Sequence, residues 1–528
     1  MNPKAQLLRL RPLLGALLLS MMLTACGGGD GGSAPTPPPA PPPGPPPGPP
    51  ISGPAWPQFS RDAQHTAVSA IATPALNRII WQTSVDLQQT LVGGQYLLTH
   101  YGSPIISANN TVLVPVKTTA QGAFRIDARS GVNGGLIWSA ASDYVVPPHN
   151  WFPSYNLTLT SNGRLYAPGA GGKVFYRENV DSAAGALQTS VFYGASVYSG
   201  AQAELNNTVM ISTPITVDPA GNAWFGFYVT AANSAGLSSG VARLSATGSG
   251  TWQPASTLAN DVGIDRVAMN SAPALSNDGA TLYVAVSNSA GRGYLLALDS
   301  ATLATTGRVA LMDPNLGTPA LISANATSSP VVGPDGDVYF GVLEANLPSH
   351  NNRGWLLHFN STLTQTKIPG SFGWDNTPTV VPASAVPSYT GTSTYLLATK
   401  YNNYGGAGSG NGQNRMAILD PFAELPDPIS GRQVMAEVMT ILGPTPDATY
   451  AGGVREWCVN TAAFDPATRS MLVNNEDGYL YRWDLSTNQL SQRIRFNNGL
   501  GQSYTPTAIG ADGTIYSINA GVLFAVGL

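Results

Sequence analysis

The chain has 528 residues, of which only 10% are charged, and it contains 58 glycines and 43 prolines. This composition favours many short strands joined by turns over a helix-rich protein, which would carry more lysine, glutamate and arginine. The net charge is −4 and no stretch concentrates basic residues, which argues against nucleic acid as a partner.

Residues 1–26 have the pattern of a secretory signal peptide. A basic stretch that ends at Arg11 precedes an apolar run from Leu13 to Leu23. This run is too short to span a bilayer, which needs about 20 apolar residues. It ends in Leu-Thr-Ala-Cys, which resembles the lipobox of bacterial lipoproteins, and the resemblance implies acylation of Cys26. We therefore expect a protein of the cell envelope that is anchored in the membrane by lipid.

Residues 27–55 are expected to form a disordered tether rich in proline and glycine. Runs such as PPPAPPPGPPPGPP favour polyproline II at about 3.1 Å per residue, so the segment can reach roughly 80–90 Å. Gly27 stands where lipoproteins retained at the inner membrane of enteric bacteria carry aspartate. By that resemblance the outer membrane is the expected location, on its periplasmic or its surface face.

From Ser103 onward the chain repeats one pattern eight times. Each copy has a Ser/Thr-x-Pro entry or a variant of it, a short apolar run, a turn and further β runs with aromatic residues. Turns such as Asn162-Gly163 and Asp335-Gly336 supply the positive φ angles that tight hairpins need. Successive copies begin 44–59 residues apart, with one interval of 84, and such intervals fit four-stranded propeller blades. The copies begin at Ser103, Tyr155, Thr213, Ala272, Ser329, Thr377, Thr461 and Thr505.

The last copy has room for three strands before the chain ends at Leu528. A fourth strand is available in front of the first copy, from Asn77 to Val85. Closing a ring in this way removes an open sheet edge. We therefore predict that residues 56–528 form an all-β, eight-bladed β-propeller closed by an N-terminal strand, with seven blades as the alternative.

The segment from Trp56 to Ser69 (WPQFSRDAQHTAVS), followed by such blades, resembles the quinoprotein-type, or PQQ-like, propeller family. The stretch from Phe124 to Trp138 is similar to the family's Ala-x-Asp-x-x-Thr-Gly-x-x-x-Trp blade signature, and stretches from Leu295 and Tyr479 parallel it. This resemblance covers nearly all of the mature chain and implies the propeller fold.

For function the same resemblance is less specific. The family includes calcium- and PQQ-dependent dehydrogenases, and also non-catalytic members such as the lipoprotein of the outer-membrane β-barrel assembly machine. Several quinoprotein alcohol dehydrogenases carry two adjacent cysteines beside the cofactor, whereas this chain has only Cys26 and Cys458. It also lacks the long charged insertions that shape the active site of those enzymes. We expect Cys458 to be a buried small residue.

Residues just ahead of each repeat should converge at the mouth of the central channel. In a propeller, the segment that joins one blade's outer strand to the next blade's inner strand lies there, and aromatic walls with a few polar groups suit a ligand site. The candidate ligand-binding residues are His100, Tyr101, His149, Asn150, Trp151, Arg266, Trp374, Asp375, Arg455, Glu456, Trp457 and Tyr504.

The alternative interpretation is that these aromatic residues cap blade junctions and that the charged residues pair with neighbours. Arg455 and Glu456 in particular suit structural pairs better than an acid–base device. No metal site is expected, because no close His/Asp/Glu spacing surrounds His100 or His149. Residues 401–453 are the main departure from the repeat, and they fit either a functional loop or an insertion without function.

No phosphate loop or His-Glu-x-x-His motif occurs in the chain, and the Gly-x-Ser-x-Gly match at residues 236–240 is followed by no helical pattern, so it does not predict a nucleophile elbow. We therefore expect a membrane-anchored, non-catalytic scaffold that binds an envelope protein or a glycan without a cofactor. The alternative is an enzyme at the channel mouth, such as a quinoprotein oxidoreductase that uses PQQ and calcium. A structural surface protein without a small ligand is the third hypothesis.

Overall fold

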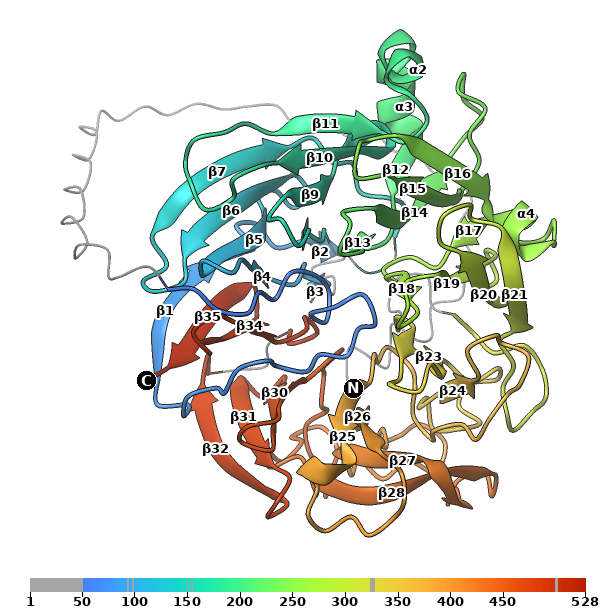
Figure 1. Ribbon diagram of the computed structural model, residues 1–528. Helices are drawn as coiled ribbons and strands as arrows, with labels where there is room; N and C mark the ends of the chain where they lie inside the picture. Colours follow the sequence, from blue (N-terminus) through green and yellow to red (C-terminus); the bar gives the residue numbers. More distant parts are fainter. Residues whose placement is uncertain are drawn as a thin grey trace, which may run out of the picture. The chain divides into compact units, whose positions relative to one another are not determined.

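The computed structural model describes residues 51–92, 95–96, 99–149, 151, 153, 155–322, 328–498 and 502–528. The chain divides into two units, residues 1–49 and 50–528, and the second unit contains every described strand. These strands form a ring of eight antiparallel blades, coloured from blue to red in Figure 1. The predicted eight-bladed β-propeller is therefore confirmed. The signal peptide and nearly all of the tether lie outside the described residues.

Blades 1 to 4 follow one another along the chain, and each is an antiparallel sheet. Blade 1 contains β4 (Ile105–Ile106), β5 (Thr111–Lys117), β6 (Phe124–Ser130) and β7 (Leu136–Ser142). Blade 2 contains β8 (Thr158–Leu159), β9 (Leu165–Pro168), β10 (Lys173–Arg177) and β11 (Gln188–Val191). Blade 3 contains β12 (Val209–Ile211), β13 (Thr216–Val217), β14 (Ala223–Val229), β15 (Gly240–Leu244) and β16 (Gly250–Pro254). Blade 4 contains β17 (Arg266–Val267), β18 (Ala274–Leu275), β19 (Thr281–Ser287), β20 (Gly293–Asp299) and β21 (Thr305–Ala310).

Blades 5 to 8 complete the ring. Blade 5 contains β22 (Val331–Val332), β23 (Val338–Val342) and β24 (Trp355–Phe359). Blade 6 contains β25 (Thr379–Pro382), β26 (Tyr395–Tyr401), β27 (Arg415–Pro426) and β28 (Gln433–Leu442). Blade 7 contains β29 (Ala463–Asp465), β30 (Ser470–Asn474), β31 (Tyr479–Asp484) and β32 (Gln489–Arg495). Blade 8 contains β33 (Ala508–Ile509), β34 (Ile515–Asn519), β35 (Val522–Gly527) and β1 (Arg78–Ser84).

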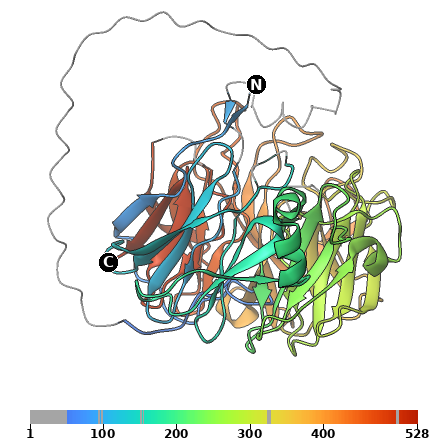
Figure 2. The same cartoon turned by 90° about the horizontal axis from the view of Figure 1, so that it is seen from above.

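A few short elements lie outside the blades. They are the hairpin of β2 (Leu91–Val92) and β3 (Gln95–Tyr96), the helices α2 (Ala195–Gly200), α3 (Gln202–Thr208) and α4 (Ala255–Ala259), and the 3-10 turns η1 (Ala170–Gly172) and η2 (Ala383–Ala385). Helices α2 and α3 stand on the outer rim of the ring (Figures 1 and 2). None of the helices in the described ranges has the length and apolarity that crossing a bilayer would require.

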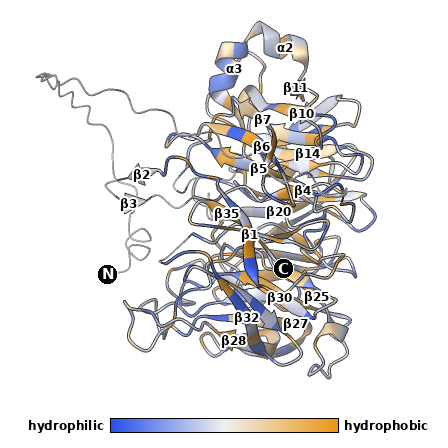
Figure 3. Cartoon of the chain, turned by 90° about the vertical axis from the view of Figure 1, so that its left-hand side faces the viewer, coloured by the Kyte–Doolittle hydropathy of each residue, from blue (hydrophilic) through white to orange (hydrophobic). Residues whose placement is uncertain are grey.

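Burial falls from the middle of a blade to its outer edge. Strand β5 is buried at every residue, because neighbouring blades cover both of its faces. The outer strand β32 alternates between exposed and half-buried residues, and it is coloured hydrophilic in Figure 3. This gradient explains why inner strands have continuous apolar sequences whereas outer strands alternate.

Strand β1 closes the ring. It pairs antiparallel with β35, with Arg78 opposite Gly527 and Ser84 opposite Val522. This pairing confirms the N-terminal closing strand predicted from the sequence. Because β35 would otherwise present an unpaired sheet edge, the closure protects the propeller from edge-to-edge association.

The segment that precedes β1 lines the channel. We call residues 53–74 the N-terminal thread, and Figure 1 shows it as the blue segment that crosses the centre of the ring. The innermost strands are as short as two residues, so their channel-facing backbone groups need partners from elsewhere. The thread supplies hydrogen bonds to seven blades in turn: Trp56 with Ile106, Pro57 with Leu159, Gln58 with Val217, Ala63 with Leu275, Gln64 with Val332, Thr66 with Val380 and Ala67 with Phe464.

Tight turns let the thread follow this circuit. Ser60, Arg61, His65 and Ala67 all have positive φ angles, which non-glycine residues rarely adopt. The imidazole of His65 is buried, with Nδ1 2.7 Å from the carbonyl oxygen of Pro330. Burial lowers the pKa of His65 to about 4, although the hydrogen bond with Pro330 acts in the opposite direction. The thread therefore contains a neutral histidine at neutral pH.

Candidate ligand site at the channel mouth

A cavity of about 40 Å³ lies where the blade junctions converge. One water needs roughly 10–15 Å³ by the same measure, so the cavity has room for a few water molecules. Phe59 of the thread contributes to its wall, and the other lining residues come from the segments that enter each blade. The lining residues are Phe59, His100, Tyr101, Asn156, Asn270, Asp375, Asn460, Tyr504, Thr505 and Pro506.

Two rings in the cavity wall, those of His100 and Tyr504, lie beside further aromatic rings. The ring of His100 lies 5.2 Å from that of Tyr504 and 5.6 Å from that of Trp151. Trp151 lies 5.8 Å from Trp374, whose ring is 6.4 Å from that of Tyr404. We call these five residues the aromatic rim. They come from four blade junctions and from the loop after β26, so the propeller brings together positions up to 400 residues apart.

A buried ion pair lies behind the rim. The ammonium nitrogen of Lys400, near the end of β26, is 3.8 Å from Oδ2 of Asp375, and both side chains are almost completely buried. The same nitrogen is 4.9 Å from the centre of the Tyr504 ring and 5.7 Å from the Trp374 ring. The buried ammonium group of Lys400 is therefore stabilised both by the carboxylate of Asp375 and by cation–π contacts.

Burial raises the pKa of Tyr504 well above its ordinary value, and the carboxylate of Asp375 adds to this shift. Burial likewise raises the pKa of Tyr404, with a further contribution from the carboxylate of Glu456. Both phenols therefore keep their protons at neutral pH. They can donate hydrogen bonds, but they cannot serve as bases in that range.

Four of the residues predicted from sequence line the cavity, namely His100, Tyr101, Asp375 and Tyr504. Trp151 and Trp374 belong to the rim, and Glu456 lies near it. The hydroxyl of Tyr101 donates to Oδ2 of Asp86 at 3.0 Å, so this residue also ties the junction to the start of the propeller.

The remaining predicted residues lie apart from the cavity. Arg266 pairs with Asp265 at 2.5 Å, and Arg455 lies 3.4 Å from Asp447. Trp457 is completely buried in the core, with its ring 5.6 Å from that of Tyr481. His149 has Nδ1 2.8 Å from the carbonyl oxygen of Pro147. Asn150 lies outside the described residues.

Sequence reasoning missed three amide side chains in the cavity wall, Asn156, Asn270 and Asn460. Asn460 immediately precedes the seventh repeat and Asn270 lies two residues before the fourth, so their position at a blade junction could have identified them. Asn150 was the one asparagine among the predicted residues. Lys400 lies inside a strand, where position along the repeat gives no indication of a site.

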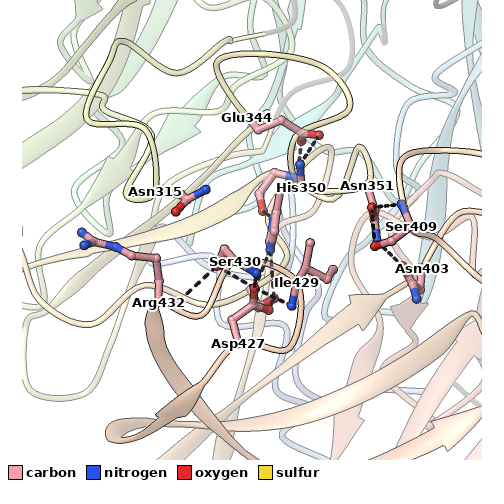
Figure 4. A network of polar contacts seen from close by, with 12 residues as sticks. Asn315, Glu344, His350, Asn351, Asn403, Ser409, Asp427, Ile429, Ser430 and Arg432 are labelled. Carbon is pink, nitrogen blue, oxygen red and sulfur yellow. Dashed lines mark hydrogen bonds and ion pairs between the residues drawn. The ribbon is translucent and has the colours of Figure 1, made fainter.

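A second polar cluster lies between blades 5 and 6 (Figure 4). Asp427 accepts hydrogen bonds from Ser371 at 2.5 Å and from the backbone of Ser430 at 2.6 Å, and Nε2 of His350 lies 3.3 Å away. The His350 ring stacks on Trp355 with 3.8 Å between centroids. Burial alone would raise the pKa of Asp427, but the hydrogen bonds from His350, Ser371 and Ser430 lower it well below its ordinary value.

This cluster resembles a Ser-His-Asp set in composition but not in accessibility. His350, Ser371 and Asp427 are all at least 98% buried, so no substrate can reach the serine. The cluster instead fixes the loop before β24 to the β27–β28 hairpin. We conclude that it is structural.

The 401–453 region is an ordered part of blade 6, consisting of the β27–β28 hairpin and two loops. The glycine-rich loop between β26 and β27 is held to the blade 5 loop by Asn351. The amide nitrogen of Asn351 donates to Oδ1 of Asn403 at 2.9 Å, and Oδ1 of Asn351 accepts from the backbone of Ser409 at 2.8 Å (Figure 4). The loop therefore supports Tyr404, its contribution to the aromatic rim.

No protein-family model matches the chain, and neither does any curated protein. Solved structures do match it. A europium-containing methanol dehydrogenase gives a TM-score of 0.54 at 10% identity, over 88% of this chain and 89% of that one. The quinohemoprotein alcohol dehydrogenase from Comamonas testosteroni gives 0.52 at 12% identity, over 89% and 80% respectively.

This chain has a quinoprotein-like propeller fold. The likeness extends over most of each chain, but at 10–12% identity it shows the fold alone. Function therefore has to be inferred from the residues at the channel mouth.

Those residues do not make up a PQQ–calcium site. The cavity has room for a few water molecules, so a tricyclic quinone with three carboxylates would extend out of it, and Asp375, the one acidic residue described in its wall, is paired with Lys400. Among the described residues no group of three or more His, Cys, Asp or Glu side chains is placed to hold a metal ion. Cys458 is buried, as predicted, and has no cysteine beside it in the sequence.

Proposed function

We propose that this protein is an envelope lipoprotein whose propeller is a non-catalytic binding scaffold with its site at the channel mouth. The observation that carries the proposal is the aromatic rim beside a cavity whose wall contains three amides and one carboxylate. A rigid closed ring that presents aromatic and polar groups at one point is suited to capturing a partner, because little conformational entropy is lost on binding.

The membrane anchor in this proposal is the acylated Cys26, by its resemblance to a lipobox. The proline-rich tether would hold the propeller up to roughly 80–90 Å from the membrane, at about 3.1 Å per residue. The outer membrane is the proposed location. The partner in this proposal is an envelope protein or a glycan.

The charges of the described residues at the mouth leave one candidate for acid–base catalysis, which at neutral pH needs a group whose pKa lies near 7. Asp375 is paired with Lys400, and the phenols of Tyr504 and Tyr404 keep their protons, so the candidate is the imidazole of His100 in the cavity wall. The alternative, a quinoprotein-type oxidoreductase, is favoured by the fold of the solved neighbours.

A photo-crosslinking amino acid tests where the partner binds. Placed at Trp374 in the full-length protein in its native envelope, it should give a defined crosslinked product on illumination, whether the partner is protein or glycan. The matched control is the same amino acid at Trp252, a half-buried tryptophan on the outer strand of blade 3. Products at 252 alone, or no product at either position, would refute binding at the mouth.

A further inference from the structure

We infer that the channel mouth binds the uncharged, hydroxyl-bearing end of a carbohydrate chain. This inference rests on the proposed function, because it names the ligand class of the same site. It follows from four properties of the mouth, which are the volume of its cavity, its charges, its hydrogen-bonding groups and its aromatic surface.

Volume limits what can enter the cavity. At about 40 Å³ it can replace a few water molecules, which corresponds to one or two hydroxyl groups or a hydroxymethyl group. A large aromatic or aliphatic side chain of a protein partner would not fit. Phe59 of the thread forms part of the cavity wall, and a cavity with room for one or two hydroxyl groups would hold a polymer by its end.

Charge excludes ionic ligands. A cationic group would normally be attracted to the faces of Trp374 and Tyr504, but the ammonium of Lys400 already lies 4.9–5.7 Å from these rings. An anionic group would meet the carboxylate of Asp375 in the cavity wall. Because Lys400 and Asp375 offset each other, the site as a whole favours a neutral ligand.

Hydrogen-bonding groups in the wall match hydroxyls. The side chains of Asn156, Asn270 and Asn460 each carry both a donor and an acceptor, as a sugar hydroxyl does. Oδ1 of Asn156 accepts from the backbone of Ser103, and Oδ1 of Asn460 accepts from Thr461, which fixes the orientation of both amides. Nδ2 of Asn270 lies 3.3 Å from Nδ1 of His100, so this amide is also held in place.

The aromatic rim supplies the remaining surface. Trp151 and Trp374 are half-buried, so parts of their rings face solvent beside the cavity. A pyranose ring offers C–H groups that pack against such faces. Nε1 of Trp374 is buried and has no hydrogen-bond partner within the described ranges, so the ring contributes its face and not its N–H group.

Calorimetric titration of the full-length protein tests this inference, in a detergent whose headgroup is not a sugar. The probes are neutral oligosaccharides that end in glucose, galactose, mannose or N-acetylglucosamine, each with a matched uronate-ended and amino-sugar-ended analogue. We expect saturable binding of at least one neutral probe. Its two charged analogues should bind about tenfold more weakly or worse, which corresponds to about 1.4 kcal/mol.

Variants locate the binding. Trp374→Ala and Asn460→Asp should each weaken it about tenfold, Trp374→Phe should retain most of it, and the matched Trp252→Ala should leave it within about twofold. Equal or tighter binding of a charged analogue would overturn the inference, as would unchanged binding in both Trp374→Ala and Asn460→Asp. If no neutral probe binds while the crosslinker at 374 captures a protein, the glycan is refuted and the binding scaffold stands. If neither is seen, both proposals fail.

Discussion

Replacing Trp81 with alanine should lower the free energy of unfolding by about 3–5 kcal/mol, as expected for a large aromatic residue removed from a core. Trp81 is 8% exposed in β1, and its ring lies 5.7 Å from that of Tyr516 in the same blade. Its Nε1 donates to the carbonyl oxygen of Gly131 at 2.8 Å, in blade 1. The side chain of Trp81 thus joins the closing strand to both blade 8 and blade 1. Chemical denaturation of the full-length protein measures the loss.

Trp81→Phe separates the contributions to this loss. It keeps an aromatic ring and removes one of the two hydrogen bonds to the carbonyl of Gly131, which also accepts from the hydroxyl of Tyr516, so we expect a smaller loss, of about 1–2 kcal/mol. Loss of stability in Trp81→Ala of less than about 1 kcal/mol would show that β1 does not hold the ring closed.

Asp427→Asn should cost a similar amount, about 3–5 kcal/mol at pH 7, because it removes one partner of a buried charged cluster. The asparagine has nearly the same shape but cannot accept every hydrogen bond that the carboxylate takes from Ser371, Ser430 and His350. Thermal and chemical unfolding of the two proteins across a range of pH measures the difference.

The pH dependence gives this prediction a sign. The pKa of Asp427 is lowered in the folded protein relative to about 3.9 in the unfolded chain, so its carboxylate stabilises the fold above about pH 4. That contribution is lost as the pH falls through the folded pKa, and the gap between the wild type and Asp427→Asn should narrow below about pH 4. Asp265→Asn is the control, because its pair with Arg266 is half-exposed and should be worth about 1 kcal/mol or less. A gap that stays constant down to pH 2 would contradict the assignment.

The fold could be predicted because the blades repeat local signals. Ser-Pro or Thr-Pro opens five of the eight repeats, and glycine turns, such as that at Gly163 with its φ of 81°, recur at the same place in several blades. Closure could also be predicted, because the last repeat lacks a strand and the residues ahead of the first repeat supply one. Contacts of the thread could not be predicted. Its hydrogen-bond partners, from Ile106 to Phe464, are up to about 400 residues away in the sequence. Neither the thread nor the inner strands have a sequence pattern that indicates which residues pair.

The site could be predicted only in part, because position in the repeat does not determine the direction of a side chain. Position at a blade junction identified His100, Asp375 and Tyr504, but it did not show which way each side chain points. Trp457 occupies such a junction and is completely buried in the core. Arg455, at the same junction, pairs with Asp447 from the preceding loop, as a structural residue would.

One titration tests most directly whether this quinoprotein-like propeller is a binding scaffold and not a quinoprotein enzyme. The full-length protein is titrated with PQQ, with and without calcium, while its tryptophan fluorescence is followed. Trp151 and Trp374 lie in the rim of the cavity and would report a quinone bound there. We expect no saturable quenching. Saturable, calcium-dependent quenching that is reduced in Trp374→Phe would contradict the proposal and place an oxidoreductase site at the channel mouth.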